Sequence, residues 1–314
     1  MATYRVVVSD QVFPTVDLER EMLADIDAEL EVAKGDIGEV LEVARDADAI
    51  LNTYLPWSEE SIAQLDRCKI IARYGIGIDN VDVEAASRHG VIVTNVPDYS
   101  VEEVAAHASA LMLAHLRKII AADELLRSGV WSIDNVRPIR RISELTLGLV
   151  GFGRIARQLA GTARSLGMSL LVHDPFIEPG DGIPELVSLD DLLARSDVVS
   201  LHAPLTPETR GLISARELAL MGERALLVNT SRGPLVVLDD LVDALRSGAL
   251  GGAVLDVFDV EPLDVARIEG VPNLIATPHM AYYSEAALQE SQRKATTQVV
   301  KVLTGLDPDY RVSP

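Results

Sequence analysis

Short apolar runs alternate along most of the chain with longer segments that have helical spacing. Within the runs, aliphatic and β-branched residues follow one another directly, as in strands that are buried on both faces of a parallel sheet. The intervening segments carry apolar residues three or four positions apart and acidic residues between them, which indicates amphipathic helices. This alternation predicts an α/β fold built from right-handed βαβ units.

The apolar runs form two groups, and each group predicts one sheet. The first predicts a five-stranded, flavodoxin-like sheet from residues 5–8, 30–33, 49–51, 70–72 and 91–94. The second predicts a larger, doubly wound parallel sheet from residues 146–150, 169–173, 198–201, 226–229, 253–255 and 274–276. A chain of 314 residues, 48% of them hydrophobic, can fill two separate cores. We therefore expect two Rossmann-like domains.

Two long helical segments suggest how the domains are connected. A buried helix is expected over residues 101–120, with Ser100 as N-cap and Glu103 in capping-box position, and a second helix over residues 284–303. We expect the second helix to return to the first domain. The second domain, residues 101–283, would then be inserted into a smaller domain of residues 1–100 and 284–314. A cleft between the domains is the expected ligand site.

A glycine-rich turn directly follows the first strand of the second sheet. Gly151, Gly153 and Ala156 have G-x-G-x-x-A spacing, and a helical segment continues beyond them. Gly151 permits the tight turn, Gly153 lets the backbone approach a pyrophosphate, and Ala156 stands where helix and strand pack closely. Such turns also occur without a cofactor, but the strand and helix on either side favour a dinucleotide-binding domain.

The acidic residue after the next strand indicates which dinucleotide is bound. This strand ends at Asp174, where a carboxylate can accept hydrogen bonds from the adenosine ribose. A 2′-phosphate would meet that negative charge, and the following Pro175 supplies no guanidinium. The sequence therefore favours NAD over NADP.

Three polar segments follow later strands of the second sheet and carry Arg232, Glu261 and His279. The carboxyl ends of parallel strands face one crevice, so these side chains can converge. A protonated imidazole can polarise the carbonyl of a 2-keto acid, a guanidinium can grip its carboxylate, and a neighbouring carboxylate favours the imidazolium form. Singly, Arg232 could cap a helix, Glu261 could be an exposed turn residue, and His279 could be an ordinary loop histidine. Their joint placement favours catalysis.

The other histidines are weaker candidates. His107 and His115 lie on the long helix, but too far apart to form a metal-binding pair. His173 and His202 lie at strand ends beside the expected cofactor site, where they can line the pocket. No metal site is expected.

In the first domain, the loop at Gly75 and Gly77 follows the fourth expected strand. Backbone N–H groups at two glycines can hold a carboxylate. The alternative is an ordinary turn in which Asp79 or Asn80 caps the next helix. These two interpretations are comparable on sequence alone.

The charge balance limits the kinds of partner. Acidic residues outnumber basic ones by 48 to 28, which opposes binding to nucleic acid and to anionic lipid surfaces. The apolar stretches are too short to span a membrane, the N-terminus has the pattern of a strand rather than of an export signal, and Cys68 is the single cysteine. We expect a cytoplasmic protein with no nucleic-acid or membrane partner. The acidic surface is compatible with a saline cytoplasm and with a GC-rich genome.

These motifs resemble the D-isomer-specific 2-hydroxyacid dehydrogenase family across nearly the whole chain. The resemblance is carried, in the family's order, by the G-x-G-x-x-A turn and by residues 75–82, 95–97, 201–206, 229–233, 255–258 and 277–279. It implies an NAD-dependent oxidoreductase that transfers a hydride between nicotinamide and C2 of a D-2-hydroxy acid or its 2-keto form. It also implies a homodimer formed largely through the long helix after Ser100, and closure of the domains around the substrate.

The resemblance further implies the residues of each site. The catalytic set is Arg232, Glu261 and His279. The implied cofactor-binding residues follow strands of the second sheet: Gly151, Phe152, Gly153, Arg154, Ile155, Asp174, His202, Ala203, Pro204, Thr230, Ser231, Arg232, Asp256 and His279. The implied substrate-binding residues are Tyr74, Gly75, Ile76, Gly77, Arg232, His279 and Tyr282.

Within the family, residues 101–104 and 279–285 are most similar to the C-terminal-binding-protein branch, where Trp is usual at the position of Tyr282. One alternative function is therefore that of an NADH-responsive corepressor-like protein, although the complete catalytic set and the short segment after the last helix favour an enzyme. The other is D-3-phosphoglycerate dehydrogenase. Residues 51–57 carry no Lys or Arg for a phosphate, and no regulatory domain follows, so we expect a substrate without phosphate. Which 2-hydroxy acid is used stays open.

Overall fold

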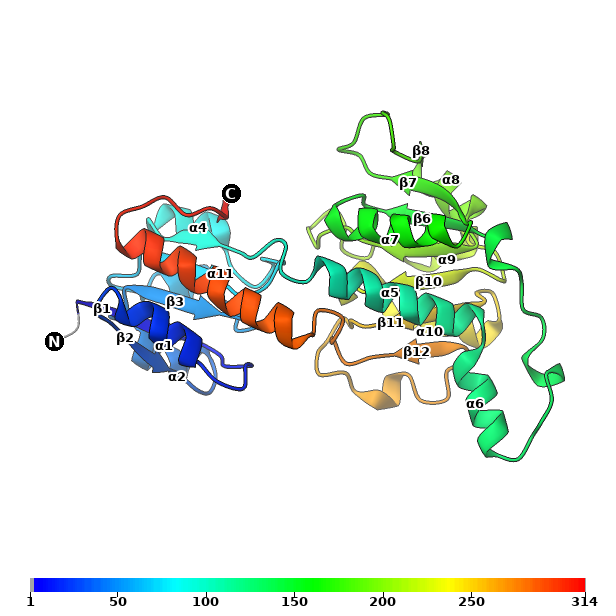
Figure 1. The fold of residues 1–314 in the computed structure, drawn as a ribbon, viewed down its shortest axis with the longest axis horizontal. Coiled ribbons are helices and arrows are strands. Elements are labelled where there is room, and N and C mark those ends of the chain that lie inside the picture. Colours follow the sequence, from blue (N-terminus) through cyan, green and yellow to red (C-terminus); the bar gives the residue numbers. More distant parts are fainter. Residues whose placement is uncertain (1–2, 314) are drawn as a thin grey trace. The chain divides into compact units, whose positions relative to one another are not determined.

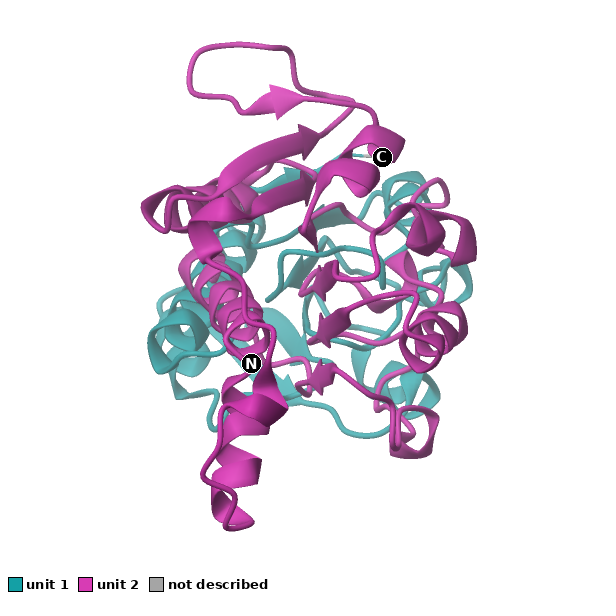
Figure 2. Cartoon of the chain, turned by 90° about the vertical axis from the view of Figure 1, so that its right-hand side faces the viewer, with its two compact units in different colours: residues 1–99, 283–314 teal, residues 100–282 magenta. Residues whose placement is uncertain are grey.

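A computed structural model describes residues 3–313, which divide into two compact units. Unit 1 combines the described residues up to Tyr99 with those from Tyr283 onward, and unit 2 comprises Ser100–Tyr282 (Figure 2). Each unit has its own largely parallel sheet with helices around it (Figure 1). The fold class is therefore α/β with two parallel-sheet domains, as the sequence predicts.

Unit 1 contains a six-stranded sheet in the order β13-β5-β4-β3-β1-β2. Its strands are β1 (Tyr4–Val8), β2 (Ala28–Val32), β3 (Ala49–Asn52), β4 (Ile70–Arg73), β5 (Ile92–Thr94) and β13 (Arg311–Val312). The first five are parallel to one another and match the expected strands. The expectation of five strands is wrong by one, because the two-residue β13 adds an antiparallel edge to β5. So short a strand has no apolar run that a sequence pattern can detect.

The helices of unit 1 pack on both faces of this sheet. They are α1 (Asp17–Ala24), α2 (Ile37–Ala44), α3 (Glu59–Ile62), α4 (Val83–Arg88) and α11 (Glu285–Leu303). Helix α11 packs against α1, β3 and β4, and Ser284 Oγ caps it by accepting from the Ala287 N–H at 3.0 Å. Helix α4 is capped by Asp82, which accepts from Ala85 N–H at 2.8 Å, so the capping by Asp79 or Asn80 considered above does not occur.

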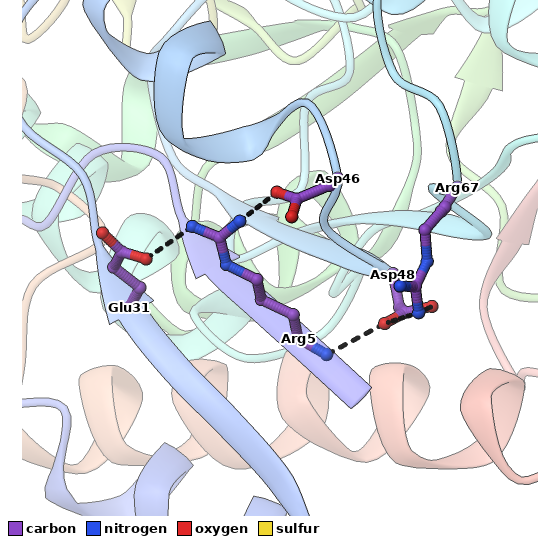
Figure 3. Close-up of polar contacts among 5 residues, drawn as sticks. All are labelled: Arg5, Glu31, Asp46, Asp48 and Arg67. Atoms are coloured by element: carbon purple, nitrogen blue, oxygen red, sulfur yellow. Dashed lines mark hydrogen bonds and ion pairs between the residues drawn. The ribbon is translucent and has the colours of Figure 1, made fainter. Parts of the chain in front are cut away.

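A network of ion pairs joins β1 and β2 of unit 1 to residues before β3 and β4 (Figure 3). The buried Asp48 carboxylate accepts from Arg67 Nη2 at 2.7 and 2.9 Å and from the Arg5 backbone N–H at 2.9 Å. The Arg5 guanidinium donates to Glu31 at 2.7 Å and also pairs with Asp46. Asp48 is therefore the buried centre of a network whose other carboxylates are exposed.

Unit 2 contains a seven-stranded parallel sheet in the order β12-β11-β10-β9-β6-β7-β8. Its strands are β6 (Thr146–Val150), β7 (Ser169–His173), β8 (Glu185–Leu186), β9 (Val198–Leu201), β10 (Leu226–Asn229), β11 (Gly252–Leu255) and β12 (Leu274–Ala276). Six of these were expected, and the two-residue edge strand β8 was not. The strand order runs outward in both directions from β6, so the sheet is doubly wound and changes direction between β6 and β9.

Unit 2 has six α-helices: α5 (Val101–Leu116), α6 (Ile119–Arg127), α7 (Arg154–Ser165), α8 (Leu189–Arg195), α9 (Ala215–Leu220) and α10 (Leu238–Ser247). All but α6 pack on the two faces of its sheet. One core packs α5 and α7 against Leu147 and Leu149 of β6. The other packs α8, α9 and α10 against strand residues such as Val199 and Leu227. Four one-turn 3-10 helices complete the unit: Asp134–Val136, Ile142–Glu144, Gly233–Leu235 and Val265–Arg267.

The helix expected over residues 101–120 is two helices. Helix α5 ends at Leu116, Lys118 adopts a left-handed backbone with φ of +53°, and α6 leaves at an angle of 57°. Ser100 is the N-cap residue, but its side chain makes no capping hydrogen bond, because its backbone (φ −131°, ψ 25°) is not in the extended conformation of a capping residue. No helix in the described chain is by itself long and apolar enough to cross a membrane, whereas α5 and α6 counted together are.

Candidate active site

The parallel strands of unit 2 end at one edge of the sheet, and the predicted cofactor and catalytic residues follow these ends. Gly151 comes after β6, Asp174 after β7, His202 after β9, Thr230 after β10 and Asp256 after β11. The loop that begins at Thr277 follows β12 and carries His279. The topology therefore gathers along one edge residues that lie far apart in the sequence.

The glycine turn after β6 has the close contacts that glycines permit. Gly151 has a φ of +87°, and a Cβ atom there would lie 2.7 Å from the carbonyl oxygen of His202. At Gly153, by contrast, a Cβ atom would meet no heavy atom of the described residues within 4 Å. Gly153 is the N-cap of α7, and no side chain in the described part of the protein caps this helix. The start of α7 is therefore open at Gly153 and has no side-chain cap from its N-cap residue, which suits an anion-binding helix end.

Asp174 is held in place by the backbone on either side of it. Its Oδ2 accepts from Phe152 N–H at 2.8 Å and its Oδ1 from Phe176 N–H at 2.9 Å. A carboxylate has about four acceptor positions, so lone pairs remain for two ribose hydroxyls. The carboxylate thus links the glycine turn to the end of β7 and keeps its capacity to bind a sugar.

The loop after β10 presents Arg232. Asn229 is buried and shapes this loop, because its amide donates to the Arg232 carbonyl at 2.9 Å and accepts from Ser231 N–H at 3.1 Å. A Cβ atom at Gly233 would overlap the backbone of Phe258, so the Arg232 loop lies directly against the loop that carries Glu261. Thr230 Oγ1 is buried and has no hydrogen-bond partner among the described residues.

Glu261 and His279 are in direct contact. His279 Nδ1 lies 2.6 Å from Glu261 Oε2, and Glu261 Oε1 accepts from Phe258 N–H at 2.8 Å. Both side chains are about one-third exposed, with relative exposures of 33% for Glu261 and 28% for His279. The ring of Tyr282 meets the imidazole edge to face, with centroids 6.1 Å apart. The contact with Glu261 thus orients the His279 ring through Nδ1.

The loop from Thr277 to Ala281 wraps around the carboxylate of Asp256. Asp256 is fully buried, and it accepts from Thr277 Oγ1 at 2.5 Å, Met280 N–H at 3.0 Å and Ala281 N–H at 2.8 Å. Its backbone carbonyl accepts from His279 N–H at 2.8 Å. Burial alone would raise the pKa of Asp256, but hydrogen bonds from His107, Thr277 and the two N–H groups outweigh burial and lower it. Asp256 is therefore an anion around which the loop from Thr277 to Ala281 is built.

Two histidines of unit 2 are kept neutral. Burial lowers the pKa of His202 to about 4, and its Nε2 lies 2.9 Å from Ser200 Oγ. Burial also lowers the pKa of His115 to about 4, with a smaller contribution from Lys118, and its ring packs against Gly252 of β11. The main chain of His202 contacts the glycine turn. Its ring is hydrogen-bonded to Ser200 and is not placed as a proton donor.

In unit 1, the predicted substrate loop follows β4. Tyr74 is buried, and its hydroxyl donates to Glu19 at 2.9 Å. Its N–H donates to the Asn52 carbonyl at 2.9 Å and its carbonyl accepts from Ser291 Oγ at 2.6 Å, so its polar groups are already paired within unit 1. The carbonyl groups of Gly75 and Ile76 accept from Val96 N–H at 3.0 Å and Asn95 Nδ2 at 2.7 Å. Within the described chain, no hydrogen bond from the N–H groups of residues 75–77 is found, which suits a carboxylate-binding loop.

Comparison with known proteins identifies the family. Residues 109–281 match the family model described as D-isomer specific 2-hydroxyacid dehydrogenase, NAD binding domain. The glyoxylate reductase of Thermococcus litoralis is 39% identical over 287 residues, which cover 88% of this chain and 86% of that protein. This chain belongs to the D-isomer specific 2-hydroxyacid dehydrogenase family, and unit 2 contains its NAD-binding domain.

Other relatives differ in length. The D-3-phosphoglycerate dehydrogenase of Synechocystis sp. is 36% identical over 307 residues, which cover 96% of this chain but 54% of that protein. This chain thus spans about half the length of the first curated relatives that it matches. The solved structure of D-lactate dehydrogenase from Aquifex aeolicus with NAD and lactic acid superposes with a TM-score of 0.88 at 29% identity, covering 96% of each chain.

The residues of unit 2 fit NAD. The open space at Gly153 and the uncapped α7 N-terminus suit a pyrophosphate, Asp174 suits an unphosphorylated ribose, and the Thr230 hydroxyl lacks a partner within the described residues. The sequence motif alone does not reveal Asn229 as the residue that shapes the Arg232 loop. Nor does it reveal His107, whose Nε2 lies 3.1 Å from Thr277 Oγ1. Its helical spacing shows which helix carries the ring, but not what the ring meets.

Proposed function

We propose that this protein is an NAD-dependent oxidoreductase that interconverts a D-2-hydroxy acid and its 2-keto acid. The observation that carries the proposal is the 2.6 Å contact between His279 Nδ1 and Glu261 Oε2, at the edge of an NAD-binding sheet. NAD, when bound, supplies or accepts the hydride that the reaction exchanges with C2 of the substrate.

His279 acts as the acid and base. Because Nδ1 is engaged with Glu261, the proton that moves is held at Nε2. In the reductive direction His279 donates this proton to the carbonyl oxygen of the keto acid, and in the oxidative direction neutral His279 removes the hydroxyl proton. Glu261 stabilises the imidazolium form and keeps the ring oriented.

Arg232 binds the substrate's carboxylate and carbonyl oxygens. Its guanidinium offers the forked donor geometry that a carboxylate accepts, and it supplies a local positive charge in a protein of net charge −20. The N–H groups of Gly75, Ile76 and Gly77 are proposed as further carboxylate donors. Tyr282, placed beside the His279 ring, is proposed to contact the substrate's side chain.

The substrate class separates two candidate activities. Similarity to several D-3-phosphoglycerate dehydrogenases at 36–38% identity favours a phosphorylated substrate. Residues 51–57, which are the last two residues of β3 and the loop after it, include no Lys or Arg to bind a phosphate. The absence of a cation there favours glyoxylate, hydroxypyruvate or a larger 2-keto acid as the substrate. We propose the unphosphorylated class.

The test is an NADH-oxidation screen over a panel of 2-keto acids that includes 3-phosphohydroxypyruvate. We expect turnover of at least one unphosphorylated 2-keto acid, with a higher kcat/KM than for the phosphorylated one. A preference for 3-phosphohydroxypyruvate would select phosphoglycerate dehydrogenase. No oxidation of NADH by any acid, together with NADH-dependent binding of a protein partner, would select the corepressor-like function of the C-terminal-binding-protein branch, to which residues 101–104 and 279–285 are similar.

We further propose a cytoplasmic homodimer. Helix α6 has no buried residue and exposes Ile119, Ile120 and Leu126, and Trp131, which follows it, is 90% exposed. An apolar surface of this kind on a soluble enzyme is typical of a subunit interface. Light scattering should give twice the chain mass of 33.9 kDa, and Ile119→Glu should reduce it to the monomer value.

A further inference from the structure

Another histidine of unit 2, His107, reaches the buried end of the loop Thr277–Ala281. His107 lies on α5, far from the nucleotide turn in sequence, and its side chain is 19% exposed. Its Nε2 lies 3.1 Å from Thr277 Oγ1 and 3.5 Å from Asp256 Oδ1. The sequence separation between His107 and Thr277 is 170 residues, so only the fold brings them together.

The hydrogen bonds at this contact have a defined direction. Thr277 Oγ1 donates its single proton to Asp256 Oδ1 at 2.5 Å, so towards His107 it can only accept. His107 must therefore carry its proton on Nε2 and donate. The result is a chain from His107 through Thr277 to the buried Asp256 carboxylate, in which each bond polarises the next.

The Asp256 carboxylate is the point that this chain supports. It also holds Met280 N–H and Ala281 N–H, which flank His279 on its carboxyl side, and Thr277 lies two positions before His279. His279 itself has a left-handed backbone with φ of +51°, a conformation that is uncommon for a non-glycine residue and that its surroundings stabilise. The buried anion and its donors provide those surroundings.

We propose that His107 is a positioning residue for the reaction: by donating to Thr277 and Asp256 it keeps the loop Thr277–Ala281 in the conformation that presents His279. The effect on turnover rests on the function proposed above, whereas the effect on the loop does not. Without the His107 donor, Thr277 Oγ1 loses a hydrogen-bond partner in a partly buried site, and the buried Asp256 carboxylate loses part of its support. The loop then samples backbone conformations in which His279 is displaced.

A purely structural role for His107 would give a different result. If its only effect were to attach α5 to the sheet, its replacement would lower stability and leave turnover per folded molecule unchanged. His115 provides the matched control, because it lies two turns further along the same helix, is buried, and packs against Gly252 rather than Asp256.

The experiment compares His107→Leu, His107→Gln and His115→Leu with the unsubstituted protein. For His107→Leu we expect kcat to fall by about 10- to 100-fold, because a displacement of about 1 Å at a catalytic group can cost that much, and the Kd of NADH to change less than about 3-fold. His107→Gln retains an N–H donor near the position of Nε2, so its kcat should stay within about 3-fold of the unsubstituted value. His115→Leu should lose stability but keep its kcat.

Amide hydrogen exchange gives a readout that needs no substrate. In His107→Leu the N–H groups of Met280 and Ala281 should exchange at least about 10-fold faster, and in His107→Gln and His115→Leu they should not. If the unsubstituted protein turns over no keto acid, the proposed function fails and the exchange rates still decide the positioning role. If His107→Leu does not fold, the comparison of His107→Gln with His107→Asn, whose shorter side chain cannot reach Thr277, replaces it. Unchanged kcat and unchanged exchange in a folded variant without the donor would overturn the proposal.

Discussion

The two carboxylate oxygens of Glu261 contact two different groups: Oε2 lies 2.6 Å from Nδ1 of His279, and Oε1 accepts a hydrogen bond from the N–H of Phe258 at 2.8 Å. The carboxylate is thereby fixed to its own loop and, through it, orients an imidazole from another strand end. A histidine that acts as a base is held by a second polar group in the same way in hydrolases and dehydrogenases that use histidine.

Removing the charge of Glu261 should impair catalysis more than substrate binding. In Glu261→Gln the amide can still contact the imidazole, but it no longer stabilises the imidazolium form. We expect kcat for keto-acid reduction to fall by about 10- to 100-fold. Steady-state kinetics from pH 5.5 to 8.5 measure this. Asp259→Asn is the control, since Asp259 pairs with Arg267 at 2.7 Å and should leave kcat within about 2-fold. Equal effects of the two substitutions would contradict the role given to Glu261.

Asp174 should set the preference for NADH over NADPH. Its carboxylate is fixed by two backbone N–H groups, so a 2′-phosphate could not displace it without breaking those bonds. Asp174→Asn keeps the shape and removes the charge, and we expect the ratio of kcat/KM for NADPH to that for NADH to rise at least about 10-fold. Glu178→Gln, an exposed neighbour, is the control. A chain that already uses both cofactors equally would refute this account of Asp174.

The sequence predicts the fold well where buried elements have a clear pattern of apolar residues. The central strands, such as β6 and β10, are buried on both faces and therefore appear as unbroken apolar runs. The two-residue edge strands β8 and β13 have partly exposed residues and leave no such run. The sequence does not predict the break at Lys118, because Ile119 and Ile120 continue the apolar composition of α5. Hydrophobic periodicity also carries no information about the backbone dihedral angles of a single residue.

The candidate site was predictable only in part, for a related reason. Parallel topology places Arg232, Glu261 and His279 at strand ends, and a sequence can indicate that much. The contacts that orient them, such as Asn229 with the Arg232 carbonyl and His107 with Thr277, depend on which elements become neighbours in space. No spacing rule connects residues on α5 to residues after β12.

The network in Figure 3 should stabilise unit 1 through its buried member. Asp48→Ala removes a buried carboxylate that accepts from Arg67 and from the Arg5 N–H, and we expect the free energy of unfolding to fall by about 2–4 kcal/mol. Asp46→Ala removes an exposed partner of Arg5 and should cost less than about 1 kcal/mol. Urea unfolding followed by Trp57 fluorescence reports on unit 1, because Trp57 is buried there whereas Trp131 is exposed. Equal losses for the two variants would show that burial does not determine the contribution.

Unit 2 should lose stability as the pH falls from 6.5 towards 4. The pKa values of His115 and His202 are lowered to about 4 by burial, so in this window the unfolded chain takes up protons that the folded chain does not. Stability is therefore highest above the ordinary histidine pKa and decreases as the pH falls, by up to about 2 kcal/mol per histidine at pH 5. Denaturation of the unsubstituted protein and of His115→Gln at pH 7 and pH 5 tests this. The pH-dependent loss should be smaller in the variant, and an identical loss would remove His115 from the explanation.

The most direct test of the catalytic assignment is to replace His279 and measure turnover and cofactor binding on the same sample. Asn is the substitution of choice, because it tolerates the left-handed backbone found at this position but cannot transfer a proton near neutral pH. For His279→Asn we predict that kcat for the best 2-keto acid falls at least about 100-fold while the Kd of NADH, measured by fluorescence titration, stays within about 3-fold. A variant that binds NADH and reduces the keto acid at the unsubstituted rate would contradict the central claim that His279 is the acid and base of this enzyme.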